Sequence, residues 1–230
     1  MSKIRVGTSG YSYFWNPGVP TSFQWYCKQG FDTVEVNASF YRFPPSSWIK
    51  TWRKAPENFD FSIKVHRSIT HYWRLKIDAV ETWNKFKSRF EEMKNKITLW
   101  LFQMPPDFAA TTENLRLFSG FFSRLNLGNS AVIEFRHPSW WREKGICEDV
   151  GAAFCSVDAP GLPSEIVSMN DVLYLRLHGR EVWYAYIYTE EELKEIIKEI
   201  EKHDAQKKYV YLNNDHGMLP NAKFLMKEIH

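Results

Sequence analysis

The sequence contains 230 residues, of which 44% are hydrophobic and 25% charged, a composition that suits one substantial globular domain or two small ones and excludes intrinsic disorder. The formal net charge of +3 neither requires nor excludes a nucleic-acid partner, because a local basic patch matters more than the sum. Three cysteines without CxxC spacing, Cys27, Cys147 and Cys155, exclude a disulfide framework and a thiolate zinc site.

In chain order, short apolar or alternating segments are followed by helical patterns. Strands are predicted at residues 3–6, 33–37, 59–66, 97–104, 131–136, 153–157, 172–178 and 209–212. Helices are predicted at residues 21–29, 46–54, 78–96, 111–125, 140–150, 190–203 and 221–229. Ser139 is expected to cap the helix at 140–150. The connection 159–170 is broken by glycine and proline and predicts no clear helix.

The alternation of strands and helices favours a parallel sheet, which can close as a (β/α)8 barrel or stay open as a doubly wound sheet. The barrel is favoured because polar residues fall at the carboxyl ends of the strands, which a barrel gathers at one mouth. The first glycine loop, GTSG, also lacks the GxGxxG dinucleotide signature. We therefore predict an α/β fold, a single TIM-like barrel domain over residues 1–230, with a weakly helical sixth connection.

The segment AVIEFRHPSWW, residues 131–141, runs from an apolar strand into charged residues and tryptophans. Because side chains alternate along an extended chain, Glu134 and Arg136 point to the same face, and His137-Pro138 ends the strand. A structural interpretation is an edge strand with a solvated ion pair. The same spacing recurs at other strand ends, however, with the pairs Glu35 and Asn37, Lys64 and His66, and Arg176 and His178.

Seven segments carry a resemblance to a known family: GTSGY, TVEVNASFYRFP, FSIKVHRSITH, LFQMPPDF, EFRHPSWW, YLRLHGR and YLNNDHG. In this order, and over essentially the whole chain, the sequence resembles the domain of unknown function 72, or YecE-like, family. The resemblance implies a TIM-like barrel with acidic, basic and histidine side chains at the strand ends, and it implies no particular reaction. Tyr11 stands where the family more often has tryptophan.

The strand ends predict a site for a small anionic substrate, because the cations expected there outnumber the carboxylates and arginine binds phosphate or carboxylate through a planar fork. The predicted catalytic residues are Glu134 as general base or acid, His178 as its proton-transfer partner, Glu35 and Asp158. The predicted substrate-binding residues are Asn37, Tyr41, Arg42, Lys64, Gln103, Arg136, His137, Trp140, Arg176, Asn213 and Asn214. We expect a hydrolase-type enzyme that acts on a phosphate- or carboxylate-bearing sugar or nucleotide-like molecule.

Several alternatives remain open from the sequence. Glu35 and Glu134 could form a glycosidase pair, although neighbouring cations would lower the pKa of the required acid. A metal-dependent phosphodiesterase, nuclease or sugar isomerase would use Glu134, Asp158 and His178, with His66 or His137, but nearby arginines would repel a cation. A nucleic-acid or nucleotide-binding module would stack bases on aromatic rings near the mouth. A structural alternative is a buried ring of ion pairs.

No cofactor or metal is predicted, and no membrane partner, because the sequence has neither a signal-peptide core nor an apolar run long enough to cross a bilayer. Reduced thiols are the default for such a cysteine pattern. We expect a cytoplasmic protein, and the sequence does not predict its oligomeric state.

Overall fold

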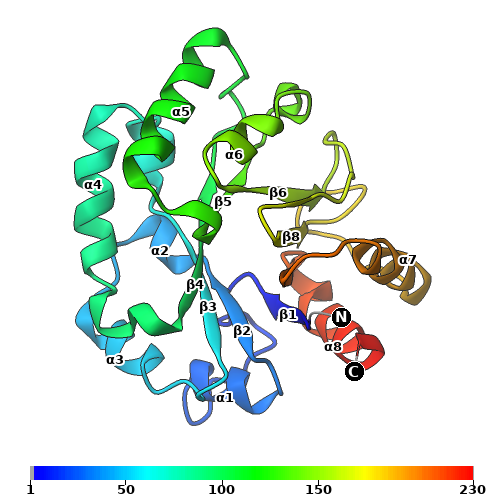
Figure 1. Ribbon diagram of the computed structural model, residues 1–230. Helices are drawn as coiled ribbons and strands as arrows, with labels where there is room; N and C mark the ends of the chain where they lie inside the picture. Colours follow the sequence, from blue (N-terminus) through cyan, green and yellow to red (C-terminus); the bar gives the residue numbers. More distant parts are fainter. Residues whose placement is uncertain (1–2, 230) are drawn as a thin grey trace.

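The computed structural model describes residues 3–229 and has a nearly closed barrel of eight parallel strands at its centre, with helices packed around the outside (Figure 1). The strands run in the order β1-β9-β8-β6-β5-β4-β3-β2, and β7 pairs antiparallel with β8. A single parallel bridge between Ser9 and Glu35 joins the first strand to the second. The predicted barrel is confirmed.

The elements match most of the predicted segments. The strands are β1 Ile4–Thr8, β2 Thr33–Val36, β3 Asp60–Lys64, β4 Ile97–Gln103, β5 Ala131–Glu134, β6 Ala153–Asp158, β7 Ser168–Met169, β8 Val172–Leu177 and β9 Lys207–Leu212. The α-helices are α1 Ser22–Lys28, α2 Ala38–Tyr41, α3 Ser46–Trp52, α4 Ile77–Ser88, α5 Thr112–Leu125, α6 Gly145–Asp149, α7 Glu190–Glu201 and α8 Met218–Ile229. As predicted, the connection between β6 and β8 contains no helix.

Local sequence explains where the longer helices begin. Thr111 and Thr189 have extended backbones, and their side chains accept hydrogen bonds from the third backbone N–H of α5 and α7. In α7 the Glu192 side chain also accepts from the N–H of Thr189, which completes a capping box. The apolar stripe of α7 is buried against the sheet at Leu193, Ile196, Ile197 and Ile200.

Two predicted helices are each divided in the structure. The helix predicted at 78–96 ends at Ser88, and a 3-10 segment, Glu91–Lys96, follows it. The break lies at Phe90, whose φ of −101° is not helical, and it turns both Phe90 and Met93 into the core. The helix predicted at 140–150 is a 3-10 turn, Pro138–Trp141, followed by α6. Ser139 does not cap it, because its hydroxyl contacts the His137 ring and accepts the Ala110 N–H instead.

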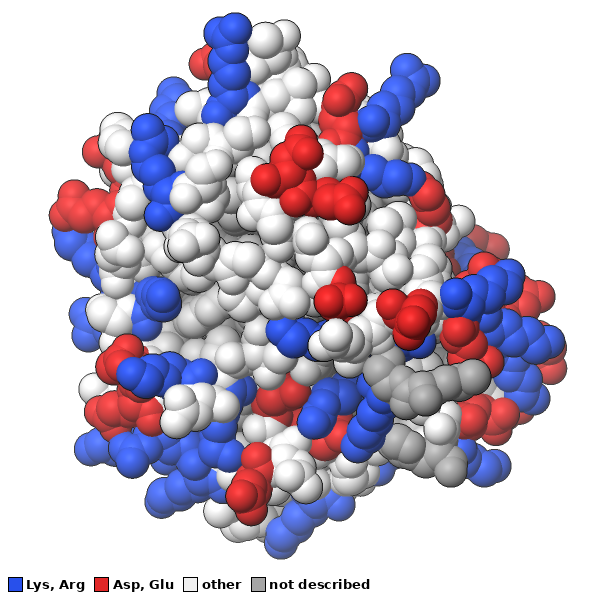
Figure 2. Space-filling view, in the orientation of Figure 1, with Lys and Arg blue, Asp and Glu red and all other residues white. Residues whose placement is uncertain are grey.

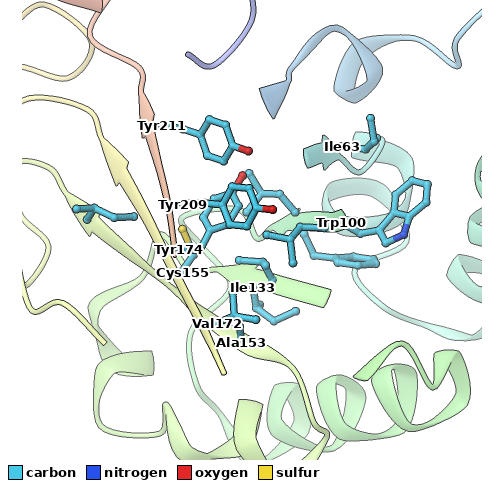
Figure 3. Close-up of a cluster of buried hydrophobic side chains, with 14 of the residues drawn as sticks. Ile63, Trp100, Ile133, Ala153, Cys155, Val172, Tyr174, Tyr209 and Tyr211 are labelled. Carbon is cyan, nitrogen blue, oxygen red and sulfur yellow. The ribbon is translucent and has the colours of Figure 1, made fainter. Parts of the chain in front are cut away.

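The barrel interior is filled by hydrogen-bonded tyrosines that reach from β8 and β9 toward β2 and β3 (Figure 3). Nearest the amino ends of the strands, Tyr209 donates to Asp60 at 2.7 Å. Tyr211 lies 2.6 Å from the Thr33 hydroxyl, and Tyr174 lies 2.7 Å from the Ser62 hydroxyl. Small residues on β2 and β3 therefore face large ones on β8 and β9, and every tyrosine hydroxyl in this stack has a partner.

We predict that Gly7→Ala destabilises the barrel, because Gly7 in β1 faces this stack. A Cβ at Gly7 would lie 2.7 Å from the Thr33 carbonyl oxygen and 2.9 Å from the Tyr211 ring. Overpacking of this kind lowers the free energy of unfolding by about 1–3 kcal/mol, which denaturant titration measures. Gly145→Ala is the matched control, since a Cβ there meets nothing within 4 Å. Equal stability of the two variants would contradict the tight interior packing.

Candidate functional site

A fully buried ion cluster lies at the carboxyl ends of β2, β5 and β8. The Arg176 guanidinium donates to Glu35 Oε1 at 2.6 Å and to Glu134 Oε2 at 2.5 Å, and all three side chains have 0% exposure. One cation thus joins two carboxylates that come from different parts of the barrel. Glu35 also accepts hydrogen bonds from the Ser9 and Tyr174 hydroxyls, both at 2.7 Å. Its two oxygens are therefore occupied by protein donors.

Glu134 is surrounded by cations and is ionised. Burial acts to raise the pKa of Glu134, but the charges of Arg136 and Arg176 and the nearby His178 outweigh it and hold the pKa well below its usual range. Arg136 Nε contacts Glu134 Oε1, and His178 Nε2 lies 3.3 Å from the same oxygen. A carboxyl group held in this state has no proton to donate at neutral pH.

His178 is neutral in this environment. Burial and the charge of Arg176 lower its pKa to about 3. Protein groups also contact both ring nitrogens, because Asn213 Nδ2 lies 3.1 Å from Nδ1 while Glu134 lies close to Nε2. The structure therefore brings His178 to Glu134 as predicted, but neither ring nitrogen is left without a protein neighbour.

Arg136 forms the outer side of the cluster, beneath an aromatic loop at residues 179–188. Its guanidinium lies 4.4 Å from the centre of the Trp183 ring, and NH1 donates to the Tyr184 hydroxyl at 3.2 Å. Gln103 Oε1 lies 3.5 Å from NH2. The Arg136 side chain is 8% exposed. The loop thus excludes water from most of the cluster, which strengthens the charge interactions inside it.

Lys64, at the end of β3, is buried without a polar partner. It is 7% exposed, and its Nζ lies over the Phe40 ring, 4.3 Å from the centroid. Within residues 3–229 the ammonium group makes neither a hydrogen bond nor an ion pair. Burial and the charge of Arg176 lower the pKa of Lys64 to about 7, although Glu134 and Glu35 act to raise it. A large share of this amine is therefore neutral at neutral pH.

Two cavities open beside these groups. One, of about 290 Å³, reaches the cluster at Ser9 and Asn37 and has aromatic walls at Tyr11, Tyr13, Trp48 and Trp52. The other, of about 450 Å³, is lined by His66, Arg67, Ser68, His71 and Tyr72, in the segment that follows β3. Burial and the charge of Lys64 lower the pKa of His71 to about 4, so this histidine is neutral too. Both spaces are suited in size to small molecules.

Four of the predicted site residues lie away from the cluster. Asp158, at the end of β6, pairs with Arg180 at 3.0 Å and not with a residue of the cluster. Trp140 is a core residue that stacks on Phe108 and Phe135. The His137 ring caps the 3-10 turn that follows it. The Asn214 side chain donates to the Tyr186 carbonyl and to the Asn221 side chain.

The remaining predicted binding residues lie at the rim. Tyr41 and Arg42 are exposed at the end of α2, and Arg67 lies over the Tyr41 ring. Asn37 donates to the Ser9 carbonyl at 3.1 Å, while its buried Oδ1 has no hydrogen-bond partner. Of the three residues central to the metal alternative, Glu134 and His178 are in contact, but Asp158 is paired with Arg180. Nowhere in residues 3–229 could three or more His, Cys, Asp or Glu hold a metal ion.

Ser9 and Tyr174 belong to the cluster but were not predicted. Tyr174 could have been predicted, because it precedes Arg176 by two residues on β8 and so faces the same side. We did not predict it, because a tyrosine ring is equally compatible with an apolar strand. The face drawn in Figure 2 has Lys and Arg interspersed with Asp and Glu.

The fold and the site define a (β/α)8-barrel protein with a buried carboxylate–arginine cluster at its mouth. The family described as "Protein of unknown function DUF72" matches residues 5–229, and the chain belongs to this family. It is 26% identical to the UPF0759 protein YunF of Bacillus subtilis, over 81% of this chain and 78% of that protein. Across residues 3–229, no helix has the length and apolar character needed to span a membrane.

Solved structures of the family share the fold. The crystal structure of a DUF72 family protein from Thermotoga maritima is 27% identical, with a TM-score of 0.85 and coverage of 99% of both chains. A DUF72 family protein from Enterococcus faecalis is 22% identical, also with a TM-score of 0.85, over 98% of this chain and 95% of that one. The barrel is thus a property of the family.

We predict that Arg176→Met destabilises the protein strongly, because it leaves Glu35 and Glu134 buried without their shared cation. Removal of one partner from a buried ion pair costs about 3–5 kcal/mol in the free energy of unfolding, which denaturant titration at pH 7 measures. Arg116→Met is the control, since Arg116 is exposed on α5. If both variants unfold at the same denaturant concentration, the cluster contributes nothing to the stability of the barrel.

Proposed function

We propose that the barrel mouth is the active site of a hydrolase-type enzyme for a small anionic molecule, in which the Lys64 amine accepts a proton. The observation that carries this proposal is the buried, unpaired amine, with a pKa lowered to about 7. General bases work best when their pKa lies near the operating pH. Among the charged groups of the mouth, Lys64 meets this condition, whereas Glu134 and His178 have pKa values far below it.

The predicted acid–base pair takes a different role in this proposal. Glu134 and His178 are occupied by Arg136, Arg176 and Asn213, so they hold the cluster rigid instead of exchanging protons. A group fixed before the reaction needs no reorganisation when charge develops, which is the basis of electrostatic catalysis. When Lys64 takes a proton from water, the carboxylates of Glu35 and Glu134 stabilise the ammonium that forms.

The charge balance of the mouth supports an anionic substrate. Two buried carboxylates, Glu35 and Glu134, are matched by two guanidinium groups, those of Arg136 and Arg176. Any charge on Lys64, and that of Arg67 at the rim, is therefore in excess. Arg67 has no ion-pair partner within residues 3–229, and it lines the cavity of about 450 Å³ together with His71. A phosphate or carboxylate there would also stabilise the protonated form of Lys64 after the transfer.

We predict that the stability of the folded protein rises as pH increases from about 7 to about 10, and that Lys64→Met abolishes this rise. In that window the unfolded chain keeps a proton on Lys64 while the folded chain has lost it. The unfolded state then binds more protons, so raising the pH favours folding. The measurement is the free energy of unfolding of both proteins against pH.

The control for this experiment is Lys50→Met, because Lys50 is exposed on α3 and its variant should follow the wild-type curve. Below about pH 7 Lys64 is charged in both states, so the curves of wild type and Lys64→Met should run parallel there. If the curves of wild type and Lys64→Met run parallel over the whole pH range, Lys64 has an ordinary pKa. That result would refute its proposed role as a general base.

We predict that the mouth binds sugar phosphates more tightly than the corresponding neutral sugars. Isothermal titration of glucose 6-phosphate against glucose measures the difference, and Arg67→Met should weaken only the phosphate, by about 5–150-fold if one charge-assisted contact is lost. Arg116→Met should leave it unchanged. Tighter binding of glucose would refute the anionic substrate, while tighter binding of a single-stranded oligonucleotide, lost with salt, would favour the nucleic-acid alternative.

A further inference from the structure

We infer that Lys64 is a covalent site, at which its amine condenses with a small carbonyl compound that also carries a negative charge, such as a 2-oxo acid. This inference rests on the proposed anion-binding mouth and on the proposed reactive amine, but not on hydrolysis. The observation behind it is geometric: Lys64 ends β3 inside the mouth, is 7% exposed, and has no hydrogen-bond or ion-pair partner within residues 3–229.

A lysine becomes a nucleophile when its nitrogen has a free lone pair. Ordinary lysines with a pKa near 10.4 are neutral in roughly one molecule in 2,500 at pH 7. Lys64 is 7% exposed, and its burial and the charges of Arg176 and Arg136 oppose its protonation. Desolvation and a neighbouring cation are the two general means of activating a lysine for imine formation. Both are present here.

The condensation balances without any further reactant. The neutral Nζ attacks the carbonyl carbon, one N–H proton passes to the carbonyl oxygen, and a carbinolamine forms. Loss of one water molecule then gives the C=N bond. When the imine nitrogen takes up a proton, its positive charge lies in the field of Glu134 and Glu35, the same carboxylates that act to raise the pKa of Lys64. The site is thus suited to hold an iminium cation.

The surroundings favour a carbonyl compound with an anionic group. The cavity lined by His66, Arg67, Ser68, His71 and Tyr72, in the segment that follows β3, has a volume of about 450 Å³, which accommodates a molecule of several heavy atoms. Arg67 supplies a positive charge in its wall. His71, also in its wall, is neutral and therefore does not repel the anion as a carboxylate would. An uncharged ketone of the same size gains none of this attraction.

The test is reductive trapping with the full chain. The protein is incubated at pH 7 with pyruvate and sodium borohydride, and in parallel with hydroxyacetone, an uncharged ketone with the same number of carbon atoms. Intact mass and peptide mapping then count and locate the label. We expect one carboxyethyl group per chain, at Lys64, at a level at least about tenfold above any other lysine and above the hydroxyacetone label at Lys64.

Two comparisons make the result specific. Lys208 is as buried as Lys64, with 5% exposure, but lies near the amino end of β9, so it should remain unlabelled. Lys64→Arg keeps the positive charge and should lose the label, whereas Lys50→Arg should keep it. Label spread evenly over exposed lysines, or equal labelling by pyruvate and hydroxyacetone, would overturn the inference.

Failure of the imine can be separated from failure of the proposed function. If pyruvate binds with measurable heat and Lys64 titrates near pH 7 but is never trapped, the imine is refuted and the anion-binding, proton-accepting mouth stands. If Lys64 titrates like Lys50 and pyruvate does not bind, both proposals fail together. Trapping at Lys64 with no binding of sugar phosphates would support the imine and restrict the anion to small carboxylates.

Discussion

The salt bridges of Arg176 to Glu35 and Glu134 are the interaction on which the rest of the mouth depends. Burial of three charges costs several kcal/mol unless each finds its partner, and here one guanidinium serves two carboxylates with no exposure to solvent. The same charge keeps Glu134 ionised and opposes protonation of Lys64. A single cation thus pairs with both carboxylates, and among the described residues 3–229 the Lys64 amine has no ion-pair partner.

The barrel supplies the environment that makes these effects large. Below the cluster, the Tyr174 hydroxyl is hydrogen-bonded to Ser62 and donates to Glu35. The ion pairs therefore lie on a packed polar layer and not on a cavity. Above it, Trp183 and Tyr184 cover Arg136. Charges enclosed on both sides interact in a medium less polarisable than water, where pKa shifts of several units are common. Lys64 lies inside this enclosure, with 7% of its surface exposed.

Much of the barrel and part of the site were predictable from local patterns. Polar residues two apart at strand ends placed Glu134 with Arg136, and Arg176 with His178, on the inner face. Asp158 was assigned to the site by its position at the end of a strand, without regard to the face on which its side chain lies. Cys155 on the same strand is near enough to Glu134 and Arg176 for their charges to affect its pKa. Asp158 is three residues further along, so its side chain lies on the opposite face. Trp140 was misplaced because sequence does not distinguish a core ring from an exposed one. The isolation of Lys64 depends on which strands pair across the barrel, and no single segment contains that information.

The central claim is that the Lys64 amine loses its proton near neutral pH while remaining inside the barrel mouth. The most direct measurement is an NMR titration of the protein labelled with ¹⁵N at the lysine side chains, in which the Lys64 Nζ resonance is assigned by its absence from Lys64→Arg. We predict a midpoint at about 7, well below the ordinary lysine value. A midpoint near the ordinary lysine value of about 10.4 would contradict it.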